Sequence, residues 1–97
     1  MSMLGLARRA GKLSMGHDMA LKAVKEKKAR LVIFSGDISP RLIEEFERAC
    51  GDNSIKCLKI EETINDIHML LGYKAGVITV NDDNFSHRIE ELIELNT

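Results

Sequence analysis

The residues best suited to bind a ligand lie between positions 16 and 37. Gly16 precedes an amphipathic run that carries four lysines: Lys22, Lys25, Lys27 and Lys28. A helix that begins after Gly16 would leave its first N–H groups free, and these groups carry a partial positive charge. Lysines on its sides would add full charges. The pattern predicts an anion-binding helix start, and a phosphate backbone is its natural partner.

Few residues are spaced for catalysis or for metal binding. His17, His68 and His87 form no i, i+4 metal pair, and no Ser, Cys or carboxylate has a spacing that specifies nucleophilic or acid–base chemistry. We therefore predict no enzyme, no metal site, no cofactor and no small-molecule substrate. His17 is the exception to weigh, because burial or the dipole of a helix start would lower its pKa. We favour a surface position for His17 beside the predicted binding edge.

The remaining local signals concern the location of the protein. Cys50 and Cys57 could pair, but two cysteines without a secretory context are typically reduced and act as small apolar residues. No apolar run reaches the roughly 18 residues needed to cross a bilayer. The apolar start of the chain is broken by Gly5, and arginines follow it. These features predict a cytoplasmic protein that neither enters a membrane nor carries a secretory signal.

The bulk composition predicts one domain over residues 1–97, with an aliphatic core because only 4% of the residues are aromatic. The net charge of −1 is unusual for a nucleic-acid binder, but the charge is unevenly distributed. Residues 1–30 contain eight basic and two acidic residues, a net charge of +6, and residues 31–97 contain six basic and 13 acidic residues, a net charge of −7. The asymmetry suits a domain that meets an anionic polymer on one side. Chance clustering of charges on solvated helices accounts for it equally well.

The elements that would position these residues follow from periodicity and from capping signals. Leu4 to Ala10 predicts a short helix that ends at Gly11, and the second helix should bury Met19 together with Ala20. Further helices are expected to begin at Ser39-Pro40 and at Asp82 or Asp83. The expected helices span 4–10, 17–27, 40–50, 62–71 and a last one after residue 83; the expected strands span 30–34, 56–60 and 75–80. This α-α-β-α-β-α-β-α order predicts a three-layer α-β-α sandwich, an α/β fold with a small mixed sheet in which helices connect parallel strands.

The segment from Gly16 to Asp37 resembles the corresponding segment of a family of small RNA-binding ribosomal proteins. This is the superfamily of archaeal and eukaryotic large-subunit proteins seven and thirty, and the chain is most similar to its small bacterial paralogues. The resemblance is carried by Gly16, by Lys22-Ala23-Val24, by Ala29 to Ile33 and by Asp37. It extends upstream through residues 4–12 and, more weakly, downstream to about Val80. It implies non-enzymatic binding of structured, kink-turn-like RNA, with ribosomal RNA as a candidate partner and an association with the ribosome.

In the resembled family, three segments that can converge on one edge hold the kinked RNA: the start of the second helix, the loop after the first long strand and the loop before the last one. Tyr73 could stack on a base, although a single exposed Tyr in a loop is also ordinary. Ser39 and Ile43 match positions that hold a flipped-out base, but an N-cap and a core-facing role are the simpler interpretations. The implied RNA contacts are Gly16, His17, Asp18, Met19, Lys22, Lys25, Asp37, Ser39, Ile43, Tyr73, Lys74 and Ala75, with nonspecific phosphate contacts from Arg8, Arg9 and Lys12.

The chain also departs from the family pattern. Asp18 stands where the family usually has Asn, and Met19 where it usually has Glu, so hydrogen bonds that read sheared guanine–adenine pairs are partly missing. The acidic segment 61–66 would repel RNA if it faced it. The alternative is therefore a protein-interaction module that has kept the fold and lost specific RNA binding. The oligomeric state is open.

Overall fold

The computed structural model describes residues 2–95, in which five helices and four strands form one sheet flanked by helices. The strand order is β1-β4-β2-β3; β2 and β3 are parallel, whereas β4 runs antiparallel to both β1 and β2. The elements in chain order are α1 (Ser2–Arg9), β1 (Leu13–Met15), α2 (His17–Lys25), β2 (Leu31–Phe34), α3 (Pro40–Asn53), β3 (Lys56–Lys59), α4 (Ile64–Leu71), β4 (Val77–Val80) and α5 (Asp83–Leu95).

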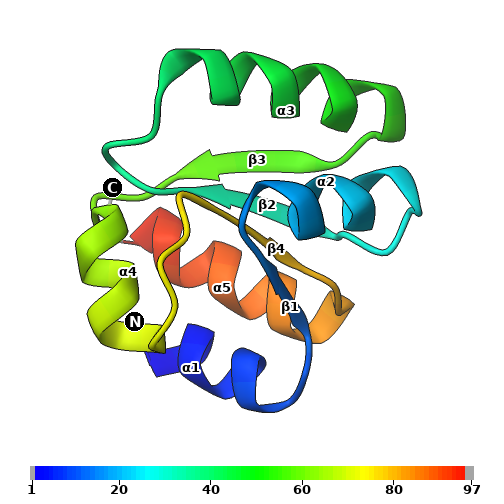
Figure 1. The fold of residues 1–97 in the computed structure, drawn as a ribbon. Coiled ribbons are helices and arrows are strands. Elements are labelled where there is room, and N and C mark those ends of the chain that lie inside the picture. The colour runs from blue at the N-terminus through cyan, green and yellow to red at the C-terminus, as the bar shows by residue number, and fades with distance from the viewer. Residues whose placement is uncertain (1, 96–97) are drawn as a thin grey trace.

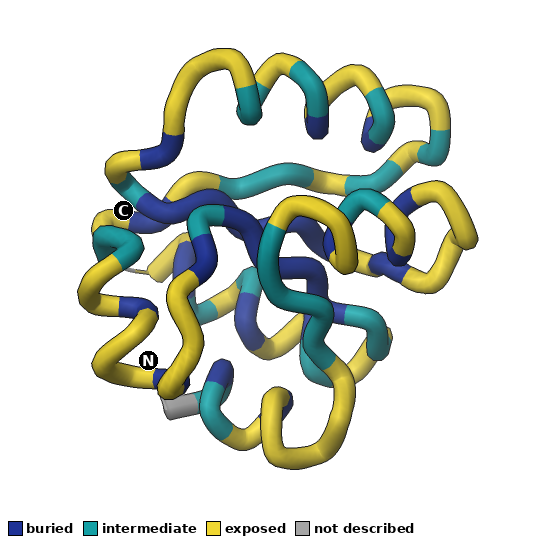
Figure 2. The backbone as a smooth tube through the Cα atoms, viewed as in Figure 1, coloured by how far each residue is buried: buried dark blue, intermediate teal, exposed yellow. Residues whose placement is uncertain are grey.

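Helices cover both faces of the sheet, as Figure 1 shows: α2 and α3 on one face, and α1, α4 and α5 on the other. Alternate residues of β2 point to opposite faces of the sheet and pack into the two cores that lie there. Leu31 and Ile33 pack with the α1, α4 and α5 side, and Val32 and Phe34 pack with the α2 and α3 side around Phe46. The central strands β2 and β4 are accordingly buried along their whole length (Figure 2). The three-layer α/β sandwich expected from the sequence is confirmed.

The ends of several helices are fixed by the signals that predicted them. Gly11 follows α1 with a left-handed backbone (φ +73°), and its N–H donates to the carbonyl of Arg8 over 3.0 Å. The Ser39 hydroxyl accepts a hydrogen bond from the N–H of Leu42 over 3.4 Å, with Pro40 as the first helical residue. At α5 the carboxylate of Asp82 caps the helix by accepting from the N–H of Phe85 over 2.9 Å.

Apart from shifts of one to three residues at the ends of elements, the structure differs from the sequence-based expectation in three respects. A short strand, β1, separates the first two helices, because Leu13–Met15 pairs antiparallel with β4. Only β2 and β3 form a parallel pair, so the expected crossover arrangement holds for this pair alone. Met19 is 55% exposed rather than buried, because the inward face of α2 is filled by small residues, with Ala20 fully buried.

Candidate nucleic-acid interface

Three segments that are distant in the sequence meet at one end of the sheet. Phe34, the last residue of β2, pairs with Val77, the first residue of β4, so the segments 35–39 and 72–76 lie side by side. The end of β1 joins them, because the N–H of Gly16 donates to the carbonyl of Val77 over 3.0 Å. We call these segments, 16–22, 35–43 and 72–76, the loop edge. The convergence inferred from the resemblance therefore holds for the backbone.

Gly16 shapes the start of α2. Its backbone angles, φ +91° and ψ 165°, belong to a region that is essentially restricted to glycine. A Cβ atom at this position would lie 3.8 Å from Cε1 and Oη of Tyr73, so the tyrosine ring lies directly against the glycine. Among the residues that the structure describes, no side chain caps α2, and the first bond within the helix runs from the N–H of Ala20 to the carbonyl of Gly16. The N–H groups at the tip of the helix are therefore available to an anion.

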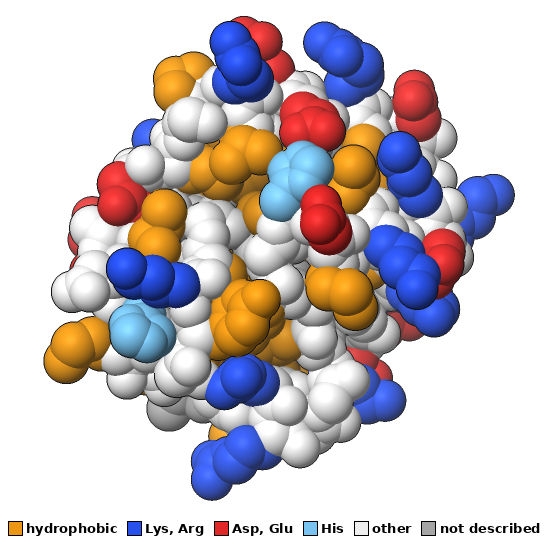
Figure 3. Space-filling view, viewed as in Figure 1, with side chains coloured by type: hydrophobic (Ala, Val, Ile, Leu, Met, Phe, Trp, Pro, Cys, Tyr) orange, Lys and Arg blue, Asp and Glu red, His pale blue; other side chains and the backbone are white. Residues whose placement is uncertain are grey.

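Cationic side chains flank this tip, but acidic ones accompany them. Lys22 and Lys25 are exposed on α2 and line a shallow hollow of about 370 Å³ together with Asp18 and Glu26. Lys74 is exposed in the segment after α4. Figure 3 shows the same mixture on the face of the molecule that is seen in Figure 1. Lys and Arg side chains lie mostly toward the rim of that face, whereas apolar side chains and a histidine with acidic neighbours lie nearer its middle.

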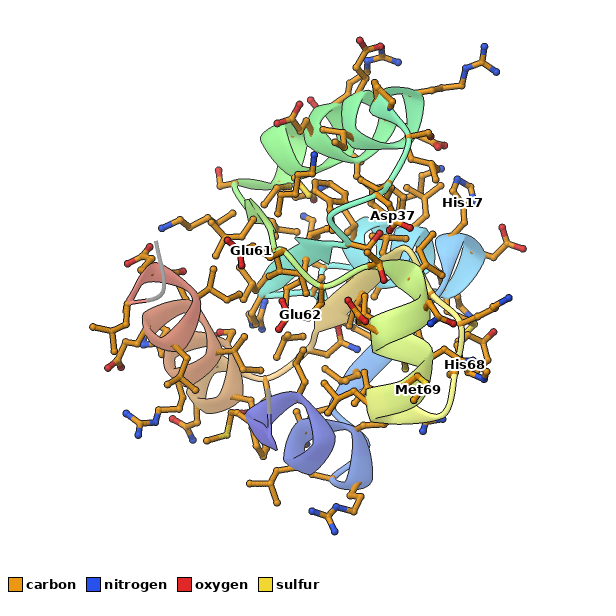
Figure 4. The ribbon with its side chains drawn as sticks, turned by 90° about the vertical axis from the view of Figure 1, so that its left-hand side faces the viewer. His17, Asp37, Glu61, Glu62, His68 and Met69 are labelled. Atoms are coloured by element: carbon orange, nitrogen blue, oxygen red, sulfur yellow. The ribbon has the colours of Figure 1, made fainter. Side chains whose placement is uncertain are left out.

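His17 ties the tip of α2 to α3. Its Nε2 atom lies 2.8 Å from Oε1 of Glu45, its Nδ1 atom lies 3.1 Å from Oδ1 of Asp18, and its ring meets Phe46 edge-on at 5.7 Å between centroids. Hydrogen bonds to Asp18 and then to Glu45 raise the pKa of His17 above 6.5, which outweighs desolvation. The lowered pKa considered from the sequence is therefore wrong, because two carboxylates face the ring. His17 does lie at the surface of the loop edge, as we favoured (Figure 4).

The segment after β2 is held by structural hydrogen bonds. Oδ1 of Asp37 accepts from the N–H of Ile64 over 2.9 Å, which lowers the pKa of the Asp37 carboxyl. Ser39 caps α3, and Ile43 is half-buried against the core on that side. The three residues thus have clear roles in the fold. The carbonyl of Glu62 accepts from the N–H of Gly36 over 2.7 Å and keeps the acidic segment before α4 close to this loop (Figure 4).

The last segment of the loop edge divides into exposed and buried residues. Tyr73 is 48% exposed beside Gly16, and Lys74 is exposed. Ala75 is only 4% exposed and belongs to the core between the sheet and α4. Its methyl group is therefore unavailable to a ligand, contrary to the expectation from the sequence. The family resemblance brought the segments of Tyr73 and Gly16 to one edge, but no local pattern in the sequence signalled the contact between the two residues.

Of the three residues expected to attract phosphate, only Arg8 reaches the border of this edge, where its Nη1 atom lies 3.7 Å from the Cβ position of Gly72. The carbonyl of Lys12 accepts from the N–H of Asn81, at the opposite end of the sheet from Gly16. The Arg8 guanidinium donates to the carbonyl of Leu71 at the end of α4, and Arg9 is exposed on α1. The basic residues of the first third of the chain are therefore divided between several surfaces, because β1 carries the chain from Lys12 at one end of the sheet to Gly16 at the other.

Within residues 2–95, no group of three or more His, Cys, Asp or Glu side chains is arranged to hold a metal ion. In that range no helix combines the length and the apolar character needed to span a bilayer. Cys50 and Cys57 are free thiols that pack in the core between α3 and β3.

Comparisons with known proteins agree with this architecture. Two proteins named RNA-binding protein YlxQ are each 27% identical to the chain: one from Enterococcus faecium, over 97% of this chain and 90% of that protein, and one from Bacillus subtilis (strain 168), over 95% and 92%. A solved structure of a protein of unknown function from Bacillus halodurans C superposes with a TM-score of 0.89 at 31% identity, over 96% of this chain and 94% of that one. The Giardia lamblia 15.5kD RNA binding protein shares the fold, with a TM-score of 0.77 at 21% identity, over 95% and 79%. A profile of the ribosomal protein L7Ae/L30e/S12e/Gadd45 family matches residues 1–88. The chain belongs to this ribosomal protein L7Ae/L30e/S12e/Gadd45 family.

Proposed function

We propose that this protein binds structured RNA at the loop edge without catalysing a reaction, and that it prefers RNA with a sharply kinked internal loop, as in ribosomal RNA. Family membership and the two relatives named RNA-binding proteins support RNA as the ligand. The observation that carries the proposal is the contact of Tyr73 with Gly16 at the uncapped tip of α2. It places an aromatic ring for base stacking beside N–H groups for a phosphate.

The lysines give this arrangement its electrostatic component. Lys22 lies within the first two turns of α2, and Lys74 follows Tyr73 directly, so both can reach phosphates next to a stacked base. Arg9 and Lys12 are not included, because they lie elsewhere on the molecule. Arg8 is not included, because its guanidinium donates to the carbonyl of Leu71 at the border of the loop edge. A cytoplasmic location and an association with the ribosome remain predictions that go with this proposal.

A second candidate function is protein binding by an edge that has lost specific RNA contacts. The acidic groups at the loop edge favour it: Asp18 and Glu45 flank His17, and Asp37 lies beside the segment that contains Glu61 and Glu62. Carboxylates at these places oppose the approach of phosphate. Partial charge compensation by His17 and by the N–H of Ile64 weakens this opposition without removing it.

A salt-dependent titration separates the two candidates. Purified protein is titrated with an RNA duplex that contains a kinked internal loop and with a fully paired duplex of equal length. RNA binding predicts a preference for the kinked duplex and a linear fall of log affinity with log salt. The Lys22→Ala variant should bind several-fold more weakly, with a salt slope smaller by about one.

The matched control is Arg88→Ala, which removes an exposed cation from α5 in the opposite layer. It should leave the affinity and the salt slope unchanged. Equal, weak binding of both duplexes, with no effect of Lys22→Ala, would reject specific RNA binding and favour the protein-binding alternative.

A further inference from the structure

A second surface, away from the tip of α2, exposes large apolar side chains. Leu6 on α1 is 46% exposed, and Met69 and Leu70 on α4 are 80% and 42% exposed. The two helices pack against each other, and Figure 4 shows Met69 on the outer surface of α4, toward α1. Exposed apolar side chains on two helices that pack against each other indicate an interaction surface.

A groove runs between these two helices. It has a volume of about 320 Å³ and is lined by Gly5, Arg8 and Arg9 of α1 and by Leu70 and Leu71 of α4. The three α1 residues are spaced i, i+3, i+4 and therefore lie on one face of the helix. Because Gly5 has no side chain and nothing lies within 4 Å of its Cβ position, the groove is open at this point. We call this surface, together with the exposed Leu6 and Met69 of the same two helices, the α1–α4 groove.

The charge of the α1–α4 groove has one sign. α1 carries Arg8 and Arg9 and has no acidic residue. Arg8 is fixed in place because its guanidinium donates to the carbonyl of Leu71. Within residues 2–95, Arg9 takes part in none of the ion pairs. The groove thus combines an apolar floor with two arginines, and neither arginine is neutralised by a carboxylate of the described chain.

We propose that the α1–α4 groove binds an amphipathic helix of a partner protein that carries acidic residues beside its apolar face. Apolar side chains at helical spacing would cover Leu70 and Met69, and carboxylates at the sides would pair with Arg8 and Arg9. RNA fits this surface less well, because phosphates would pair with the arginines but leave the apolar side chains uncovered. A symmetric contact with a second copy would place arginines against arginines.

Selection from a peptide library tests the proposal. The library displays helical peptides with a fixed leucine stripe at i, i+3, i+4 and i+7, and the flanking positions are randomised among Glu, Lys, Gln and Ser. The groove predicts enrichment of Glu over Lys, and chemical-shift changes caused by a selected peptide should map to α1 and α4. The Arg9→Glu variant should bind that peptide about tenfold more weakly and should favour Lys at the same positions.

Apolar contacts in the groove are tested by two further variants. Met69→Gln should weaken peptide binding several-fold, whereas Leu95→Gln, which alters an equally exposed apolar residue at the end of α5, should not. Thermal unfolding confirms that each variant is folded, and titration with the kinked RNA should give wild-type affinity for Met69→Gln. Enrichment of Lys, absence of any charge preference, or shifts that map outside α1 and α4 would overturn the proposal. So would a dimer of the protein alone that Met69→Gln dissociates.

Discussion

Gly16 has a conformation that other residues adopt only with strain, so its replacement is informative. We expect Gly16→Ala to lower the free energy of unfolding by about 1–2 kcal/mol, because φ +91° is unfavourable for alanine, while the added Cβ makes only an ordinary contact with Tyr73. Urea denaturation measures this change. Gly51→Ala is the matched control: Gly51 lies within α3 with open space at its Cβ position, so the change should stabilise by about 0.5–1 kcal/mol. Effects of equal sign would contradict this account of Gly16.

His17 should make stability depend on pH near neutrality. Because Asp18 and Glu45 raise the pKa of His17 in the folded protein, protonated His17 favours folding. This contribution is fully present below the unfolded pKa of about 6.5 and is lost as the pH rises through the folded pKa. The free energy of unfolding of wild type relative to His17→Gln should therefore be larger near about pH 5.5 than near about pH 8.

Salt provides the control for this pH effect. The ring and its two carboxylates are exposed, so the difference between wild type and His17→Gln should be small and should shrink as salt is added. A difference that is constant with pH, or one that grows toward alkaline pH, would contradict the assigned pairing.

Individual residues show where sequence-based inference succeeds and where it fails. The matching of Gly16 and Lys22 to a family motif placed both at the surface of the loop edge, because a short contiguous motif keeps its local geometry. Ala75 was misplaced, because burial depends on α4 packing over it. The partner of His17, Glu45, could not be inferred, since it comes from a different helix.

The end of α2 offers a test of helix termination. α2 ends at Lys25, and Lys27 then adopts a left-handed backbone with φ 63°, a position that glycine usually fills. Lys27→Gly should raise the free energy of unfolding by about 0.5–1 kcal/mol, because it removes the Cβ strain of a left-handed residue. Lys25→Gly, inside the last turn, should instead lower it by about 1 kcal/mol. Thermal or urea denaturation of both variants checks the predicted opposite signs.

The helices and strands differ in how well the sequence predicted them. Helix starts at Ser39-Pro40 and Asp82 were predictable because capping is a local interaction. β1 was not, because Leu13–Met15 is too short to show a period of two and forms only through its pairing with β4. β2 and β4 were predictable as buried strands, but their antiparallel direction was not, because burial on both faces gives the same apolar run in either direction.

The charge of the whole molecule is organised differently from the charge of the chain. The first 30 residues have a net charge of +6, yet the fold separates Lys22 at the loop edge from Lys12 at the opposite end of the sheet. Arg8 and Arg9 line a third surface, the α1–α4 groove, and Arg8 stands where this groove borders the loop edge at Gly72. Charge summed along a segment is therefore a poor guide to the charge of a surface, and the proposed RNA contact depends on a few residues around Gly16 rather than on a broad basic face.

The most direct test of RNA binding at the loop edge is an amide chemical-shift titration of the protein with the kinked RNA at low salt. We predict that the largest changes fall together on residues 16–22 and 72–75, and that they are reduced in Lys22→Ala and unchanged in Arg88→Ala. Largest changes on α5, or at residues 27–30 and 52–55 at the opposite end of the sheet, with none at Gly16 and Tyr73, would contradict the proposal.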